Sequence, residues 1–189
     1  MVQLASLLAG VARYLAEAHE PWDEHAAALG SGEPVDAVAV SASPAAPTFD
    51  ELETSPATAD LVSQIRSSRQ LLRWTQNSSY TDPEFLGRYA YCELLGPKGQ
   101  VFNDRISAGL LYLAPKTRYP AHAHPAEEIY HLLAGPSEWQ VGSGNPEQRL
   151  PGDRMVHGSG VAHSMRSGSS PMVALYLWRG NIGSPAVFV

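Results

Sequence analysis

Apolar residues near the start of the chain repeat with the period of an α-helix. The repeat is made by Leu4, Leu7, Leu8, Val11 and Leu15. Positions three and four apart lie on one face of a helix, so this pattern predicts an amphipathic helix over residues 2–19. His19 and His25 lie in or just after that segment, and we expect both to be solvated surface residues.

A second helical pattern follows over residues 58–75. Its apolar stripe is made by Leu61, Ile65 and Leu72. Thr58 precedes the stripe at the position where a hydroxyl commonly caps a helix. Residues 30–56, between the two helices, are rich in Ala, Ser, Pro and Gly, which favour turns and irregular backbone. We therefore expect two helices joined by a loop.

From about residue 85 onward, the pattern changes to short aromatic and aliphatic runs separated by Gly, Pro and Asn. The runs are YAYCELLG, ISAGLLYLAP, EEIYHLLAG, SEWQVGSG and MVALYLWRG. Many short strands with regular turn signals are typical of an antiparallel β-sandwich or barrel. The expected fold is mainly β, with a helical N-terminal extension and Pro/Ala-rich loop over residues 1–84 and a β-barrel over residues 85–189.

Composition and charge narrow the classes of protein. The chain has 189 residues and a net charge of −6, and no long basic run marks a surface for nucleic acid or anionic membranes. No apolar run reaches the ~18 residues of a membrane span, and the first residues lack the positive leading region of a signal peptide. We expect a cytoplasmic monomer or homodimer. The single cysteine, Cys92, excludes an internal disulfide and is expected to be a small buried hydrophobe.

Most of the histidines lie in one stretch of the chain, between His122 and His163. Side chains two residues apart on a strand share a face. The even-numbered residues that would share one face of a hairpin are His122, His124, Glu128 and Tyr130. Glu127 and His131 would face the opposite side. The hairpin would then present two imidazoles, a carboxylate and a phenol together.

Such a set on one face predicts a metal site. A buried carboxylate without a partner is strongly unfavourable, and a divalent cation removes that cost while using the imidazole lone pairs. Downstream, PGDRMVHGSGVAHSMRS adds His157 and His163. Mixed nitrogen and oxygen ligands favour one divalent transition metal, Fe²⁺, Zn²⁺, Mn²⁺, Ni²⁺ or Co²⁺, over Ca²⁺ and Mg²⁺. Positions left open on the metal are typical of a catalytic site.

The spacing of these residues resembles the metal motifs of the cupins. The first motif is matched by His122-x-His124-xxx-Glu128 followed by Gly135, and the second by Gly160-xx-His163. The match is partial where Lys116, Gly158 and Ser167 replace the usual glycine, proline and asparagine. The resemblance implies a cupin double-stranded β-helix barrel with the metal inside it.

A narrower resemblance is to the DddQ-type dimethylsulfoniopropionate (DMSP) lyases. It is carried by Tyr119-Pro120-x-His122-x-His124, by Glu127-Glu128-Ile129-Tyr130 and by Leu175-Tyr176-Leu177-Trp178-x-Gly180. These carbon–sulfur lyases cleave DMSP to dimethyl sulfide and acrylate by β-elimination, so the resemblance implies a small zwitterionic sulfonium substrate. It also implies that His124, Glu128 and His163 bind the metal, with His122 at the remaining cupin ligand position.

The resemblance also implies roles for two tyrosines near the predicted metal site. By this resemblance, Tyr130 is a fourth metal ligand or the base that removes the proton beside the substrate carboxylate, and Tyr119 is the competing base. Aromatic faces attract cations, and those available to the sulfonium are Trp139, Tyr176 and Trp178. The alternatives are another metal-dependent cupin enzyme, such as a dioxygenase or isomerase, and a non-catalytic cupin that binds a small molecule.

Overall fold

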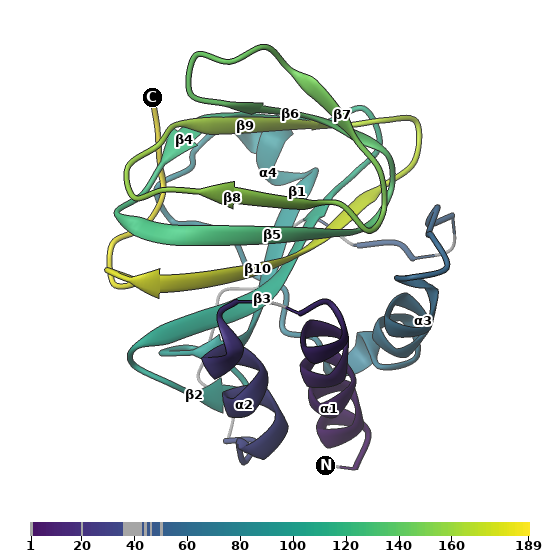
Figure 1. Cartoon of the computed structure of the whole chain (residues 1–189). Coiled ribbons are helices and arrows are strands. Elements are labelled where there is room, and N and C mark those ends of the chain that lie inside the picture. The colour runs from purple at the N-terminus through teal and green to yellow at the C-terminus, as the bar shows by residue number, and fades with distance from the viewer. Residues whose placement is uncertain (1, 20, 36–42, 44, 46, 50) are drawn as a thin grey trace.

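The computed structural model describes the whole chain except residues 1, 20, 36–42, 44, 46 and 50. Helices dominate the first part of the chain, and strands dominate the rest (Figure 1). The helical elements are α1 (Val2–Glu17), α2 (Asp23–Ser31), α3 (Ala59–Ser67), the 3₁₀ turn η1 (Arg69–Leu71) and α4 (Pro83–Leu86).

The strands form two sheets that enclose a barrel lumen. The six-stranded sheet has the order β2-β1-β3-β10-β5-β8, and the five-stranded sheet has the order β11-β4-β9-β6-β7. All pairings are antiparallel except β1 with β2. The strands are β1 (Tyr89–Gly96), β2 (Val101–Phe102), β3 (Ile106–Leu113), β4 (Arg118–Ala123), β5 (Ala126–Ala134), β6 (Ser137–Val141), β7 (Glu147–Arg149), β8 (Arg154–His157), β9 (His163–Ser167), β10 (Met172–Gly180) and β11 (Val187–Phe188).

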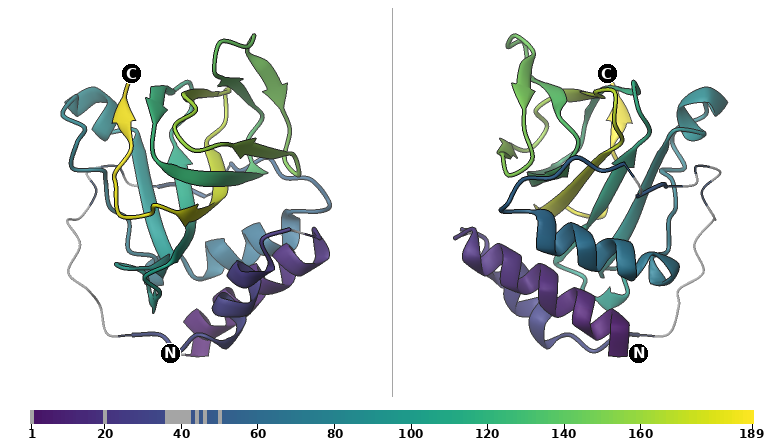
Figure 2. Two further views of the ribbon diagram at one scale, coloured as in Figure 1. Left: turned by 60° about the vertical axis from the view of Figure 1, so that its left-hand side comes forward. Right: turned by 90° about the vertical axis from the view of Figure 1, so that its right-hand side faces the viewer.

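The six-stranded sheet separates two apolar clusters, because alternate residues of a strand face opposite sides. On β5, Ile129 and Leu133 pack with the helices, whereas Tyr130 and Leu132 pack in the lumen against residues of the other sheet. Figure 2 shows α1, α2 and α3 gathered on one side of the barrel, with α4 away from them. The long central strands are therefore buried on both faces, which agrees with their nearly continuous apolar sequence.

The expected mainly β fold with N-terminal helices is confirmed. The first helix ends at Glu17, close to the expected boundary at residue 19. The second expected helix ends at Ser67 instead of residue 75, because Leu72 is extended and Thr75 forms a β-bridge with Tyr91. The expected domain boundary after residue 84 falls inside α4 and stays a prediction.

Two further expectations concern single residues. Thr58 does precede α3, but its side chain makes no capping bond to the helix and instead accepts a hydrogen bond from the Ser55 backbone N–H. His25 lies on α2, which the sequence did not predict, and its exposed fraction is 0%. The expectation that His25 is solvated is therefore wrong, whereas His19 is exposed and Cys92 is buried, as predicted. None of the described helices is long and apolar enough to cross a bilayer.

Candidate metal centre

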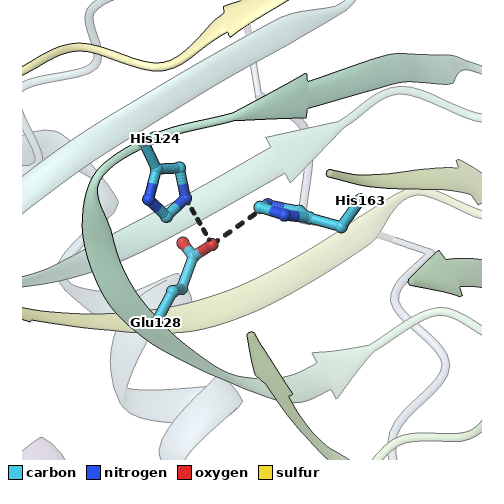
Figure 3. A group of neighbouring side chains, drawn as sticks. All are labelled: His124, Glu128 and His163. Carbon is cyan, nitrogen blue, oxygen red and sulfur yellow. Dashed lines mark hydrogen bonds and ion pairs between the residues drawn. The ribbon is translucent and has the colours of Figure 1, made fainter. Parts of the chain in front are cut away.

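The histidine-rich segment crosses from one sheet to the other. β4 lies in the five-stranded sheet and β5 in the six-stranded sheet, so the expected hairpin is wrong. His124 lies in the short connection between these strands, and Glu128 follows on β5. His163 begins β9, directly opposite His122 of β4. Figure 3 shows that His124, Glu128 and His163 nevertheless point to one place, because both sheets face the same lumen.

His124, Glu128 and His163 form a compact and buried group. Nε2 of His124 lies 2.9 Å from Oε2 of Glu128, and Nε2 of His163 lies 3.1 Å from the same oxygen. Each residue offers one ligand atom within 4.8 Å of the others. Ligand atoms that share a tetrahedral ion at about 2.0–2.2 Å lie roughly 3 Å apart, so the spacing is compatible with one metal ion.

The other ring nitrogen of each histidine bonds to a backbone carbonyl. Nδ1–H of His124 donates to the carbonyl oxygen of Ala126, and Nδ1–H of His163 donates to that of Val161, each over 3.0 Å. The tautomer that binds a metal through Nε2 carries its one N–H at Nδ1, so in that form Nε2 of each ring would present a lone pair to an ion beside Glu128. Backbone carbonyls commonly orient metal-binding histidines in this way.

The close approach of these groups is compatible with a cation between them. A lone pair and a carboxylate oxygen repel each other at about 3 Å, unless a proton or a metal ion lies between them. Nε2 of His163 is buried and, among the described residues, has no aligned hydrogen-bond partner. The fully buried Glu128 also needs compensation for its charge. The residues present therefore fit a divalent cation.

The electrostatics of the two neighbouring groups differ. Burial alone would raise the pKa of Glu128, but the polar contacts and charge of His124 and His163 outweigh it and hold this pKa well below its usual value. Burial raises the pKa of the Tyr130 phenol well above its usual value, and the nearby charge of Glu128 raises it further. Without a metal ion, therefore, Glu128 is ionised and Tyr130 is a neutral phenol.

His122 and Tyr119 lie beside this group rather than in it. The ring of His122 is 4.2 Å from that of His163, but its nitrogens are not among the three mutually close ligand atoms. Its Nδ1–H donates to the carbonyl of Pro120. Tyr119 is stacked on His122 with ring centroids 4.0 Å apart, and its hydroxyl shares a 2.7 Å hydrogen bond with Tyr80. Sequence reasoning did not single out Tyr80.

His157 was grouped with His163 in the sequence, although no motif position made it a ligand. It lies opposite Glu128 across β5 and β8, and its ring is stacked on His163 with centroids 4.1 Å apart. Its exposed fraction is 1%, and neither ring nitrogen has a hydrogen-bond partner among the described residues. Burial lowers its pKa to about 3, so the ring is neutral.

A cavity of about 690 Å³ opens beside the group and is lined by Glu128, Tyr130, Tyr176 and Trp178 among others. Trp178 lies opposite Glu128 on neighbouring strands, and its indole N–H donates to Oε1 of Glu128 over 2.5 Å. Trp139 is not among the residues that line this cavity. Its ring packs 5.1 Å from that of Tyr130, and its indole N–H donates to Ser137.

Comparison with known families bears directly on this site. Residues 37–174 match the sequence profile described as dimethylsulfoniopropionate lyase. The chain belongs to the dimethylsulfoniopropionate lyase family. The matched range contains the three clustered residues together with His122, Tyr119 and Tyr130.

Individual relatives agree with this membership. DMSP lyase DddQ of Ruegeria pomeroyi is 41% identical over 117 residues, which cover 61% of this chain and 57% of the relative. A putative DMSP lyase, DddL of Cereibacter sphaeroides, is 32% identical over 112 residues, which cover 58% of this chain and 47% of the relative. The matches thus span about half the length of these relatives.

A solved structure extends the likeness to the whole fold. The crystal structure of DMSP lyase DddQ from Ruegeria pomeroyi DSS-3 superposes with a TM-score of 0.85 and 31% identity, covering 99% of this chain and 96% of that one. A structure of the DMSP lyases RdDddP and RnDddQII matches with a TM-score of 0.75 at 22% identity, covering 97% of this chain and 98% of that one. The cupin barrel with N-terminal helices is therefore the fold of this chain.

Proposed function

We propose that this protein is a metal-dependent carbon–sulfur lyase that cleaves dimethylsulfoniopropionate to dimethyl sulfide and acrylate by β-elimination. Membership of the DMSP lyase family supports this activity. The observation that carries it is the cavity in which Glu128, with His124 and His163 beside it, adjoins the Tyr130 phenol. An acidic candidate ligand and a candidate base thus line one cavity.

The donor set suits a divalent transition metal. Two imidazole nitrogens and one carboxylate oxygen are ligands that Fe²⁺, Zn²⁺, Mn²⁺, Ni²⁺ and Co²⁺ accept. His124, Glu128 and His163 would hold the ion, and His122 and Tyr130 are the proposed further ligands. A bound divalent ion would supply positive charge that stabilises the carboxylate end of the substrate as negative charge develops at the adjacent carbon.

The elimination needs a base at the carbon next to the substrate carboxylate. We assign this role to Tyr130, whose phenol lies beside Glu128. The positive charge of a bound divalent ion would favour the phenolate form of Tyr130. In that form Tyr130 takes the proton, the C–H electron pair forms the C=C bond of acrylate, and the C–S bond breaks with its pair moving to sulfur. Dimethyl sulfide leaves as a neutral molecule, so no general acid is required at the sulfur.

The opposite end of the substrate carries the sulfonium. Tyr176 and Trp178 line the cavity, and a contact of an aromatic face with a cation contributes roughly 0.5–2 kcal/mol. Tyr119 lines the same cavity and is proposed to contact the substrate. Because Trp139 packs behind Tyr130, its proposed contribution is to hold that phenol in place.

A direct assay tests the proposal. Purified protein is loaded with each candidate metal and mixed with DMSP, and dimethyl sulfide is measured by gas chromatography. Release is expected from the loaded protein and not from a metal-free control. Glu128→Gln should abolish release, whereas Glu147→Gln, which changes an exposed carboxylate on β7, should leave it unchanged. No release with any metal would reject the assignment.

A further inference from the structure

The fold connects the metal centre to the N-terminal helices through Trp178. On the cavity side, the indole N–H of Trp178 donates to Oε1 of Glu128 over 2.5 Å. The same ring lies 4.2 Å from the ring of His124, centroid to centroid. Trp178 therefore contacts two of the three candidate metal ligands directly.

The two oxygens of Glu128 have different partners. Oε1 accepts the bond from Trp178, whereas both histidine contacts, with His124 and with His163, are made by Oε2. A hydrogen bond to one oxygen of a carboxylate limits rotation of the whole group. The bond from Trp178 thus keeps Oε2 turned toward the two imidazoles.

The backbone of Trp178 is hydrogen-bonded to a residue of α2. Nε2–H of His25 donates to the backbone carbonyl of Trp178 over 2.9 Å, although the two residues are 153 positions apart. His25 is completely buried, and its ring is stacked on that of Trp22. Removing this donor would leave a carbonyl at the helix–sheet contact without its partner, which is unfavourable.

The next residue of β10 makes a second attachment to the same segment. The guanidinium of Arg179 lies 4.2 Å from the centre of the Trp22 ring, and its Nε donates to Oε2 of Glu127 over 2.7 Å. Trp178 is paired with Glu128 and Arg179 with Glu127 in the ladder of β10 and β5. The N-terminal segment therefore contacts, from outside the barrel, the part of β10 that pairs with Glu128 of β5.

We propose that His25 is a positioning residue of the metal centre. Through the Trp178 carbonyl it fixes the end of β10, and Trp178 in turn orients Glu128 toward the ion. The helical N-terminal segment is then part of the machinery of the metal site. This inference rests on the metal site proposed above and is independent of the identity of the substrate.

A measurement on the metal-free protein tests whether His25 positions Trp178. The chain has four tryptophans, and the indole N–H signal of Trp178 is identified in ¹⁵N spectra as the one that Trp178→Phe removes. His25→Phe keeps an aromatic ring against Trp22 but removes the donor. It should shift the Trp178 signal and speed its exchange with solvent, and His25→Gln, which keeps an N–H donor, should lie nearer to wild type.

The matched control is Leu29→Ala, because Leu29 is buried on the same helix. This change weakens the packing of α2 without removing a hydrogen bond to Trp178. It should lower the melting temperature and leave the Trp178 indole signal in place. If His25→Phe leaves that signal and its exchange rate as in wild type, the proposal is wrong.

Binding of Co²⁺ tests whether Trp178 and His25 affect the metal site. It is measured by visible absorption and by competition with a chelator. Loss of a partner that orients a metal ligand typically weakens binding by about 10–100-fold. We expect Trp178→Phe to raise the Kd of Co²⁺ by about 10-fold or more, His25→Phe by about 3-fold or more, and Leu29→Ala by less than about 2-fold.

The double variant decides whether the two residues act in series. If His25 acts through Trp178, adding His25→Phe to Trp178→Phe should raise the Kd little further. The proposal would be overturned if the fold-changes in Kd of the two single variants multiplied in the double variant. An unchanged Kd in His25→Phe would also overturn it. Failure of wild-type protein to bind Co²⁺ would remove the metal site and this inference together. Co²⁺ binding without dimethyl sulfide release would remove only the proposed substrate.

Discussion

The phenol oxygens of Tyr80 and Tyr119 lie 2.7 Å apart and share a hydrogen bond in the cavity wall. Tyr119 is also stacked on His122, so both its hydroxyl and its ring already have partners. Tyr130 is different, because its phenol adjoins Glu128, where the positive charge of a bound ion would act on it directly. Of the two tyrosines that the sequence left in competition, Tyr130 is therefore the better candidate for the base.

Changing Tyr130 to Phe removes the hydroxyl and keeps the ring against Trp139. Loss of a general base typically lowers a rate by about 10²–10⁴-fold, so kcat for dimethyl sulfide release should fall by about 100-fold or more. Bound metal should remain close to the wild-type amount, because His124, Glu128 and His163 are untouched.

The matched variant is Tyr119→Phe, which should change KM more than kcat. Turnover is measured by gas chromatography and bound metal by elemental analysis on the same preparations. Unchanged kcat in Tyr130→Phe would reject Tyr130 as the base. A loss of kcat confined to Tyr119→Phe would transfer the role to Tyr119.

Metal should stabilise the fold as well as serve the reaction. A ligand that binds only the native state at 100 times its Kd adds about 2.7 kcal/mol to the free energy of unfolding. Adding Zn²⁺ to chelator-treated protein should therefore raise its melting temperature in a concentration-dependent way. Glu128→Gln should abolish the increase, and an equal increase in that variant would place the stabilising ion elsewhere.

Cys92 should be unreactive in the native protein. Burial raises the pKa of this thiol from 9.0 to about 12, which lowers the thiolate fraction about 1000-fold at neutral pH. Modification by a chromogenic disulfide at pH 8 should be at least that much slower than in urea-unfolded protein. Fast labelling of the native chain would contradict its burial.

The same shift has a consequence for stability at high pH. The native Cys92 thiol holds its proton more tightly than the unfolded one, so the native state is disfavoured once the unfolded thiol ionises. Its contribution to stability is fully present below pH 9 and is lost as pH rises toward about 12. Cys92→Ala should remove this part of the pH dependence in urea unfolding, although its loss of side-chain volume also lowers stability at all pH values.

His157 offers a test of a buried histidine without hydrogen bonds. Because neither nitrogen has a partner among the described residues, His157→Phe removes unsatisfied polar atoms and keeps a flat ring against His163. The free energy of unfolding should stay the same or rise by about 1 kcal/mol. It is measured by urea unfolding of metal-free protein, and a fall of about 2 kcal/mol or more would indicate that His157 has a bonded partner.

The apolar repeat in the sequence predicted the helix whose burial follows from that repeat alone. The Leu4–Leu15 stripe gave α1 nearly to its end, because the buried face of that helix has an unbroken apolar repeat. Trp22, which precedes α2, and His25 and Leu29 on α2 also follow a helical spacing, but this stripe was missed because His25 was taken as a polar surface residue. Burial of His25 depends on the distant Trp178 carbonyl, which no local pattern contains.

Some features of the candidate site were likewise predictable from the sequence, and others were not. Alternation along β5 correctly separated Glu128, which faces the lumen, from Glu127, which pairs with Arg179 outside. The convergence of His163 on Glu128 was reached through motif spacing, because strand period alone does not bring two sheets together. Tyr80 and the bond from Trp178 to Glu128 depend on contacts across 39 and 50 residues and needed the fold.

Elemental analysis tests the central claim most directly: that His124, Glu128 and His163 hold one transition-metal ion. Wild-type protein, purified and then loaded with each candidate ion and desalted, should retain about one ion per chain. Glu128→Gln and His163→Ala should retain almost none, while Glu147→Gln should match wild type. Wild-type protein without a bound transition ion under every loading condition, or equal retention in all four proteins, would contradict the account.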